Sequence, residues 1–247
     1  MESDFLRKDG RKTDELRSVK FIPNFIDYPE GSVLVQMGKT RVLCNVTIEE
    51  SVPTWMTGRG KGWMTAEYAM LPRATHTRTE RETKGPGARS QEIKRLIGRS
   101  LRKAVDLTKL GERTILLDCD VLQADGGTRT ASITGGYVAL AIALNGLIKK
   151  GICDSQVLQK PVAAVSVGIL DGQEILDLCY VEDSNADVDM NVVMSEKGEF
   201  IEIQGTSEGL TFQRSQMNSL LDLAEHGISK LIELQKEILA NSLKDLK

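Results

Sequence analysis

The sequence predicts an α+β fold in which helices pack on mixed sheets, and three observations support this. Along the 247 residues, strand-rich and helical stretches alternate, strands before helices, in two successive rounds. Hydrophobic residues make up 40% of the chain and charged residues 27%, as in an ordinary globular protein. No linker rich in proline and serine divides the sequence. We therefore expect one domain over residues 1–247, in which 1–6 form a flexible N-terminal extension.

The first round consists of short strands followed by a helix. Runs rich in β-branched residues, bounded by turn residues, predict strands over 19–26, 32–37, 40–48 and 64–70. The stretch 75–89 combines many charges with two glycines and a proline, and it has no apolar period. It predicts a long, mobile loop, where functional contacts often lie. Apolar residues at helical spacing then predict a helix over 90–107, with Ser90 as its N-cap.

The first round continues with a strand over 114–122 and a helix over 128–150, and Gly151 stands where a C-cap glycine belongs. The second round repeats this order of strands before a helix. A final apolar helical pattern covers 215–240. Between the two helices, further strands are predicted over 162–169, 174–181, 188–194 and 200–204.

The connection between the strand over 114–122 and the next helix is the most informative segment. It reads Gln-Ala-Asp-Gly-Gly-Thr-Arg-Thr-Ala-Ser over 123–132. Backbone N–H groups and the positive end of a helix dipole converge at such a turn and form a cradle for an anion. Thr128, Arg129 and Thr130 add hydroxyl donors and a guanidinium group. The segment therefore predicts a phosphate site. The glycine signatures of P-loop and dinucleotide-binding proteins are missing from the sequence, so neither class is indicated.

Charge is distributed unevenly along the chain. The net charge of −3 alone argues against a nucleic-acid binder, and an aromatic content of 4% argues against base stacking as the main RNA-binding device. However, residues 73–103 contain ten Lys or Arg against three Glu, whereas 171–208 contain eleven Asp or Glu against one Lys. The basic segment can hold a polyanion and the acidic one a divalent metal ion. Two oppositely charged surfaces in an oligomer contact would explain the pattern equally well.

The acidic segment contains a cluster of three carboxylates. In a strand, Asp187 and Asp189 would point to the same face, and Asp183 could return to it through a bend. Such a cluster suits Mg²⁺ or Mn²⁺, although an acidic turn in solvent would have the same composition. Arg89 precedes a helix start, as Arg129 does, and together they could neutralise a phosphate; alone, Arg89 would be an ordinary surface arginine.

The sequence does not suggest chemistry through a histidine base or a covalent intermediate. It contains two histidines, His76 and His226, and no serine or cysteine has the context of a nucleophile. His76, in the basic loop, has the setting of a surface residue. The four cysteines are widely spaced, which argues against zinc and disulfides and for a reducing compartment. With a polar N-terminus and no run expected to span a bilayer, the sequence predicts a cytoplasmic protein without a membrane partner.

Several long segments resemble the ribonuclease PH family. They extend from about Arg7 to the last helix, and they imply a ribonuclease PH-like domain of the ribosomal protein S5 domain 2-like type. The matching segments are 9–17 (DGRKTDELR), 61–75 (KGWMTAEYAMLPRAT), 92–102, 118–135, the acidic segment through 191, and 204–206 (QGT).

This resemblance implies a tRNA nucleotidyltransferase, that is, a phosphorolytic 3′→5′ exoribonuclease. Such an enzyme trims the 3′ ends of precursor tRNA, and by extension rRNA, and releases nucleoside 5′-diphosphates in a reversible reaction. It uses inorganic phosphate as co-substrate, requires Mg²⁺ or Mn²⁺, and assembles as a homohexamer, a trimer of dimers. Polynucleotide phosphorylase, a relative in the wider family, has a lysine two residues after its second carboxylate; here Asn191 stands there, so that role is not transferred.

The resemblance also implies roles for individual residues. Arg89, Arg129, Asp183 and Asp189 are the expected catalytic residues, and the two carboxylates are the expected metal ligands; Asp189 could instead protonate the leaving oxygen. Phosphate binding is assigned to Arg89, Gly127, Thr128 and Arg129, with Thr130 added by the cradle argument. Arg73, Arg78 and Arg81 are the expected RNA contacts.

Two other functions remain open at this point. A catalytically inactive, RNA-binding ring subunit would be expected to lose the arginine or carboxylate positions, whereas both sets are present. A metal-dependent hydrolytic exoribonuclease would attack with water, which needs no anion site.

Overall fold

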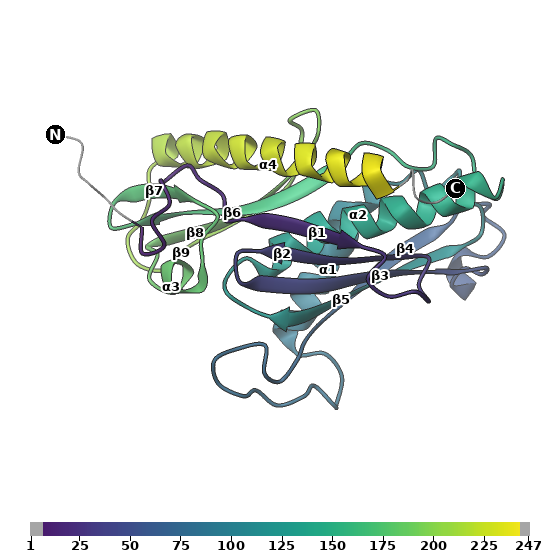
Figure 1. Cartoon of the computed structure of the whole chain (residues 1–247), viewed down its shortest axis with the longest axis horizontal. Helices are drawn as coiled ribbons and strands as arrows, with labels where there is room; N and C mark the ends of the chain where they lie inside the picture. Colours follow the sequence, from purple (N-terminus) through teal and green to yellow (C-terminus); the bar gives the residue numbers. More distant parts are fainter. Residues whose placement is uncertain (1–6, 243–247) are drawn as a thin grey trace.

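Two β-sheets and three long helices form the part of the chain that the computed structural model describes, residues 7–242 (Figure 1). The expected N-terminal extension at 1–6 lies outside the described residues. The predicted α+β class is confirmed.

The first sheet has five strands in the order β1-β2-β3-β5-β4. Neighbouring strands are antiparallel except β4 and β5, which run parallel, so this sheet is mixed as predicted. Gly38, with φ 57°, makes the tight turn between β2 and β3. The strands are β1 (Val19–Pro23), β2 (Gly31–Met37), β3 (Thr40–Glu49), β4 (Trp63–Met70) and β5 (Thr114–Gln123).

The second sheet has four strands in the order β7-β6-β8-β9. All its neighbouring pairs are antiparallel, so only one of the two sheets is mixed. Asp171 and Gly172, with φ 50° and 73°, form the turn between β6 and β7 that the sequence predicts. The strands are β6 (Val162–Leu170), β7 (Gln173–Leu176), β8 (Val188–Ser195) and β9 (Phe200–Ser207).

The helices join the two sheets. The central helix α2 (Thr128–Lys149) packs against β2 and β3 of the first sheet and against β6 of the second. Helix α1 (Ala88–Arg102) packs on β4 beside α2, and α4 (Arg214–Ser242) lies along β6 and β7 of the second sheet (Figure 1). Two short helices, η1 (Thr54–Met56) and α3 (Tyr180–Asp183), complete the described fold.

Helix α2 corrects one expectation about membranes. Among the described residues, it is long and apolar enough to cross a bilayer by length and composition, with a mean hydropathy of 1.6 over its most apolar stretch. From the sequence, no run long enough to span a bilayer is expected. However, 83% of that stretch is buried inside the protein. Its apolar surface is covered on nearly all sides because it packs against two sheets and two helices, as expected of a central core helix.

Two predicted elements differ from the structure. The strand predicted over 174–181 ends at Leu176, because Asp177 adopts the left-handed conformation with φ 54° and α3 begins at Tyr180. The helix predicted over 90–107 covers Ala88–Arg102. Its N-cap is Gly87 and not Ser90, whose hydroxyl donates to the side chain of Glu82.

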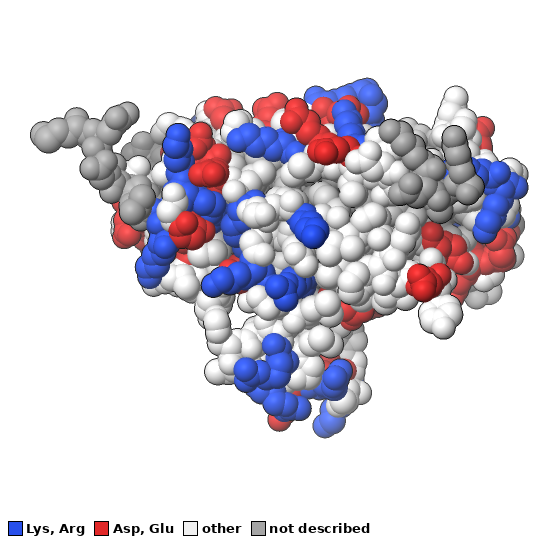
Figure 2. Space-filling view, viewed as in Figure 1, with Lys and Arg blue, Asp and Glu red and all other residues white. Residues whose placement is uncertain are grey.

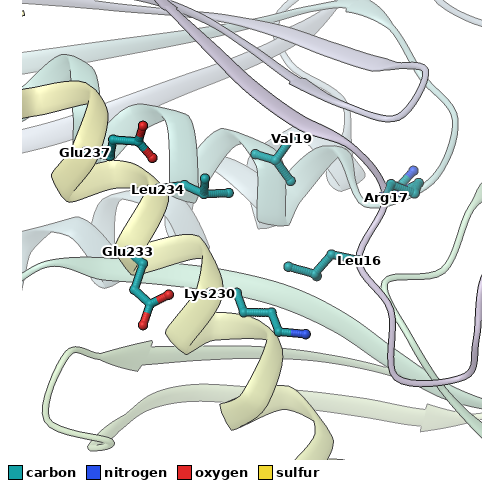
Figure 3. A pocket seen from close by; sticks show the side chains of 7 residues that line it. All are labelled: Leu16, Arg17, Val19, Lys230, Glu233, Leu234 and Glu237. Atoms are coloured by element: carbon teal, nitrogen blue, oxygen red, sulfur yellow. The ribbon is translucent and has the colours of Figure 1, made fainter. Parts of the chain in front are cut away.

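A groove lies where α4 passes the segment before β1, with a volume of about 340 Å³ (Figure 3). Leu16, Val19 and Leu234 give it an apolar floor, and charged side chains of α4 stand at its rim. The side chain of Arg17 points away from α4, toward partners described below (Figure 3). The groove has no converging set of polar donors, so it is not the candidate site.

The close contact of α2 with the first sheet predicts the effect of a small substitution. A Cβ atom at Gly135 would lie 2.5 Å from Val35 Cγ1 on β2. We expect Gly135→Ala to lower the free energy of unfolding by about 1–3 kcal/mol, measured by urea denaturation. The control is Gly146→Ala in the same helix, where a Cβ would meet nothing within 4 Å. Alanine should stabilise there by up to about 1 kcal/mol through helix propensity. Equal stability of the two variants would contradict this packing.

Candidate active site

A cleft of about 710 Å³ lies where the connection from β5 to α2 meets α3 and the start of β8. It is the place where the sequence-predicted residues come together, although they are far apart along the chain. Six of the predicted residues line it: Arg89, Gly127, Thr128, Arg129, Asp183 and Asp189.

The glycine loop, residues 124–127, forms one wall of the cleft. Gly126 and Gly127 both have positive φ, 77° and 63°, which L side chains rarely adopt. The hydroxyl of Thr40 donates to the carbonyl of Gly126 at 2.7 Å and accepts the N–H of Asp125 at 2.9 Å. The loop is therefore held in one shape, with the N-terminus of α2 opening into the cleft. That helix end favours an anion, as the sequence predicts.

The two threonines of α2's first turn play different parts. Thr128 lines the cleft, and its hydroxyl lies 2.8 Å from the hydroxyl of Tyr68. Burial raises the pKa of Tyr68, so this phenol stays neutral and can position Thr128. By contrast, Thr130 is fully buried and donates to the carbonyl of Gly127 at 2.9 Å. The expectation that the Thr130 hydroxyl adds a donor to the phosphate site is therefore corrected: it stabilises the helix start.

Both predicted phosphate arginines lie in the first turn of a helix, Arg89 in α1 and Arg129 in α2. Arg89 is exposed at the cleft. Arg129 also lines the cleft, and its Nη1 lies 3.4 Å from Oε1 of Gln204 on β9 and 3.8 Å from Oε1 of Glu92 on α1. Two guanidinium groups and a helix N-terminus thus line the same cleft, where they favour an anion.

Two carboxylates, Asp183 and Asp189, line the same cleft. Asp183 is the last residue of α3 and Asp189 the second residue of β8. Burial raises the pKa of Asp183, and the negative charge of Asp189 raises it further; Arg129 and Arg89 act in the opposite direction. Burial likewise raises the pKa of Asp189, again against the effect of Arg129. Asp183 is exposed to solvent as a residue, and it lines the cleft, where neighbouring protein atoms displace part of its water.

Asp187 does not join these carboxylates. It precedes β8 and is absent from the cleft lining, and its backbone N–H donates to the carbonyl of Ile169. The prediction of Asp187 and Asp189 on one strand face is therefore wrong, because the strand begins after Asp187. Asn191 does line the cleft.

The glycine loop touches the segment that carries the carboxylates. A Cβ atom at Gly126 would lie 2.6 Å from the carbonyl oxygen of Leu178 and 2.8 Å from the backbone nitrogen of Tyr180. Only glycine permits this approach of two backbones. The anion cradle and α3 are thus in direct contact.

An ion pair that is not among the sequence-based predictions links the same two segments. Arg17 binds Asp177 with both sides of its guanidinium group, Nε to Oδ2 at 3.0 Å and Nη2 to Oδ1 at 2.7 Å. Its Nη1 donates to the carbonyl of Asp125 in the glycine loop at 2.6 Å. Both side chains are buried. A signal was available: Asp177 follows Ile-Leu and precedes Leu, and an acid in an apolar run indicates a buried, paired charge.

A second buried pair holds α3. Arg7 binds Glu182 of that helix through two hydrogen bonds of 2.7 Å. Glu182 in turn accepts the N–H of Cys179 at 2.9 Å, and this bond caps the N-terminus of α3. Glu182 directly precedes Asp183 in the chain. The N-terminal segment thereby positions the element that carries Asp183.

The predicted RNA contacts lie outside the cleft. Arg73, Arg78 and Arg81 are exposed on the loop 71–87, which has neither helix nor strand. Two threonines of this loop, Thr75 and Thr79, line the cleft. The loop projects below the body of the protein, and Lys and Arg side chains gather on it (Figures 1 and 2). A polyanion bound to the loop would thus lead into the cleft.

The donors in the cleft fit a divalent cation bound together with substrate. Among residues 7–242, no group of three or more His, Cys, Asp or Glu side chains could hold a metal ion. Mg²⁺, however, commonly uses one or two carboxylates, several waters and the substrate's phosphates. Asp183 and Asp189 offer two carboxylates whose raised pKa values reflect burial and, for Asp183, mutual repulsion. A cation between them would relieve that repulsion.

An anion cradle and paired carboxylates in one cleft, on an α+β scaffold, define an enzyme that acts on phosphate esters. Comparison with known proteins makes the class specific. The 3′ exoribonuclease family matches the chain with its domain 1 over residues 15–144 and its domain 2 over residues 160–227. The chain belongs to this 3′ exoribonuclease family.

Similar proteins cover nearly its whole length. Ribonuclease PH of Bacillus subtilis (strain 168) is 58% identical over 245 residues, which span 98% of this chain and 100% of that protein. Ribonuclease PH of Crocosphaera subtropica is 57% identical over 236 residues, 96% of this chain and 98% of the relative.

Solved structures share the fold. Rice (Oryza sativa) Rrp46 has a TM-score of 0.77 at 20% identity and covers 94% of this chain and 100% of its own. An Archaeoglobus fulgidus exosome with RNA bound to the active site has a TM-score of 0.76 at 26% identity, covering 93% of this chain and 92% of its own.

The raised pKa of Asp183 predicts a stability change. In the native state Asp183 binds its proton more tightly than in the unfolded chain, so stability falls as pH rises from the ordinary aspartate value through the raised one. Asp183→Asn should therefore raise the Tm of the metal-free protein near neutral pH and lose this advantage in acid. The control is Asp171→Asn, in an exposed turn with φ 50° that asparagine tolerates. A lower Tm for Asp183→Asn at neutral pH would contradict the burial of this carboxylate.

Proposed function

We propose that inorganic phosphate, held by Arg89, Arg129 and the glycine loop, is the nucleophile in this cleft. The chain is a phosphorolytic 3′→5′ exoribonuclease, a nucleotidyltransferase that acts on tRNA. One observation carries the proposal for the site: two arginines and a helix N-terminus line the same cleft as two carboxylates. The arginines and the helix N-terminus suit a small anion, and the carboxylates suit the scissile phosphate and its cation.

The reaction needs positioning more than activation. Phosphate is anionic at neutral pH, so an oxygen of it can attack the terminal phosphorus of RNA without a histidine base. The new P–O bond forms as the bond from phosphorus to the 3′ oxygen of the preceding ribose breaks. That oxygen takes up a proton, and the terminal residue leaves as a nucleoside 5′-diphosphate. One phosphate bond replaces another of similar energy, so the reaction is reversible.

The carboxylates act at the scissile phosphate. We propose that Asp183 and Asp189 hold Mg²⁺ or Mn²⁺, which polarises the phosphodiester when bound. The raised pKa of Asp189 also suits proton donation to the leaving 3′ oxygen. The variant Asp189→Asn distinguishes the two roles of Asp189. If Asp189 is a metal ligand, the variant binds the metal ion more weakly; if Asp189 is the proton donor, the variant has a lower kcat even at saturating metal.

The basic loop is proposed to hold the RNA. Arg73, Arg78 and Arg81 project from loop 71–87, whose threonines line the cleft entrance. Charge contacts of this kind bind the backbone irrespective of sequence. They would guide the 3′ end of a precursor tRNA, or of rRNA, toward the carboxylates.

The assembly and the compartment are likewise proposals. We infer a homohexamer, a trimer of dimers in the cytoplasm, from the ribonuclease PH resemblance; structural relatives come from exosomes. The mass of the particle in solution tests this assembly.

The two alternatives have less support. In this chain both arginines and both carboxylates line one cleft, which an inactive RNA-binding subunit does not require. A hydrolase would attack with water and would have no use for the anion cradle.

Two substitutions should have separable effects. Arg129→Ala is expected to raise the KM for phosphate and to slow phosphorolysis by roughly 100-fold or more, by analogy with loss of one oxyanion donor. Arg78→Ala, on the loop, should instead raise the KM for RNA and reduce its dependence on salt while leaving the KM for phosphate unchanged. Steady-state kinetics with varied phosphate, RNA and salt measure both. Unchanged phosphate kinetics in Arg129→Ala would refute the assignment.

A further inference from the structure

Tyr180 exposes an aromatic ring inside the cleft. Its relative exposure is 52%, high for a large apolar side chain, and it is the only aromatic residue among those that line the cleft. Neither the phosphate site nor the carboxylates make use of this ring. An exposed ring in a binding cleft offers an apolar face to a ligand that has one.

Tyr180 lies between the glycine loop and Asp183. Its backbone nitrogen would be 2.8 Å from a Cβ atom at Gly126, so the residue adjoins the glycine loop. Asp183 follows one helical turn later in α3 and lines the same cleft. A ring at this position therefore adjoins both the proposed phosphate site and a proposed metal ligand.

A second ring, that of His76, lies next to the ring of Tyr180, although His76 itself does not line the cleft. The centroids of the His76 and Tyr180 rings are 6.3 Å apart, with an angle of 52° between the planes. His76 belongs to loop 71–87, which is tied to the glycine loop by a 2.8 Å hydrogen bond from the N–H of Ala124 to the carbonyl of Ala74. Both rings therefore belong to segments that contact the glycine loop: Tyr180 belongs to α3 and His76 to loop 71–87.

We propose that Tyr180, with His76 beside it, binds the nucleobase of the 3′-terminal nucleotide by stacking. The inference rests on the proposed function, because that nucleotide is the one released. Every base has a π-face, so stacking holds the 3′ end without selecting its sequence, as successive trimming requires. The charged groups of the cleft suit the phosphates of the nucleotide, and Tyr180 supplies the surface that its base lacks elsewhere in the cleft.

The test pairs a protein variant with a substrate that lacks the base. Removal of the first nucleotide is measured for an RNA that ends in adenosine and for the same RNA with an abasic 3′-terminal ribose. Wild type should lose about 10- to 100-fold in kcat/KM on the abasic end, the range expected for one stacked base. Tyr180→Ala should lose a similar factor on the adenosine end and nothing further on the abasic one. Tyr180→Phe should behave as wild type, and the KM for phosphate should stay unchanged throughout.

A matched control is the neighbouring residue in α3. Val181 is 40% exposed but absent from the cleft lining, so Val181→Ala should keep the full preference for a base. His76 does not line the cleft either, but its ring lies beside that of Tyr180, so His76→Ala should reduce the preference in part. Tyr180→Leu provides a second variant in case alanine disturbs α3, and it should also lose the preference. A full preference retained in both Tyr180→Ala and Tyr180→Leu would overturn the inference.

A binding measurement separates this result from failure of the proposed function. RNA with 2-aminopurine at its 3′ end reports stacking by fluorescence, and without added phosphate no phosphorolysis occurs. If wild type binds the base through Tyr180 but releases no diphosphate when phosphate is added, the function fails and the base site stands. If diphosphates appear but the fluorescence response is the same in Tyr180→Ala, the function stands and the base site is refuted.

Discussion

The buried ion pair between Arg17 and Asp177 is the interaction on which the cleft depends. Asp177 lies where β7 has ended and the backbone turns through a positive φ toward α3. Arg17 neutralises it and also holds a carbonyl of the glycine loop. One guanidinium group thus fixes the anion cradle relative to the helix of Asp183. A buried charge without its partner strongly destabilises the fold, so the glycine loop and α3 cannot move apart without a large loss of stability. The close backbone contact at Gly126 adds a steric constraint on the distance between the glycine loop and the start of α3.

The elements with strong periodicity could be predicted from the sequence. Helix α2, the hairpin at Gly38 and the glycine loop lie where local patterns predict them, because turn residues and apolar spacing act over short distances. The strand predicted over 174–181 was wrong for a tertiary reason: Asp177 bends the chain to reach Arg17, 160 residues away in sequence. Thr130 was misassigned because a hydroxyl that caps a helix and one that faces a ligand have the same sequence signature.

The cleft combines charges that do not stabilise the fold. Burial raises the pKa values of Asp183 and Asp189, which means that their ionised forms are disfavoured in the protein without a cation. The arginines of the cleft offset this only in part. Phosphate, a divalent cation and RNA would complete the balance, because the anion meets the arginines and the cation meets the carboxylates. The charges of the cleft are therefore not balanced among themselves, and the substrates of phosphorolysis would balance them.

The identity of the nucleophile is the central claim, and isotopic labelling tests it most directly. The protein is incubated with a 3′-extended tRNA, Mg²⁺ and phosphate that carries ³²P, and the products are separated by chromatography. If the anion cradle holds the attacking group, the label appears in the β-phosphate of nucleoside diphosphates, and no nucleotides are released when phosphate is left out. Unlabelled nucleoside monophosphates, formed with or without phosphate, would show that water attacks and would contradict the account.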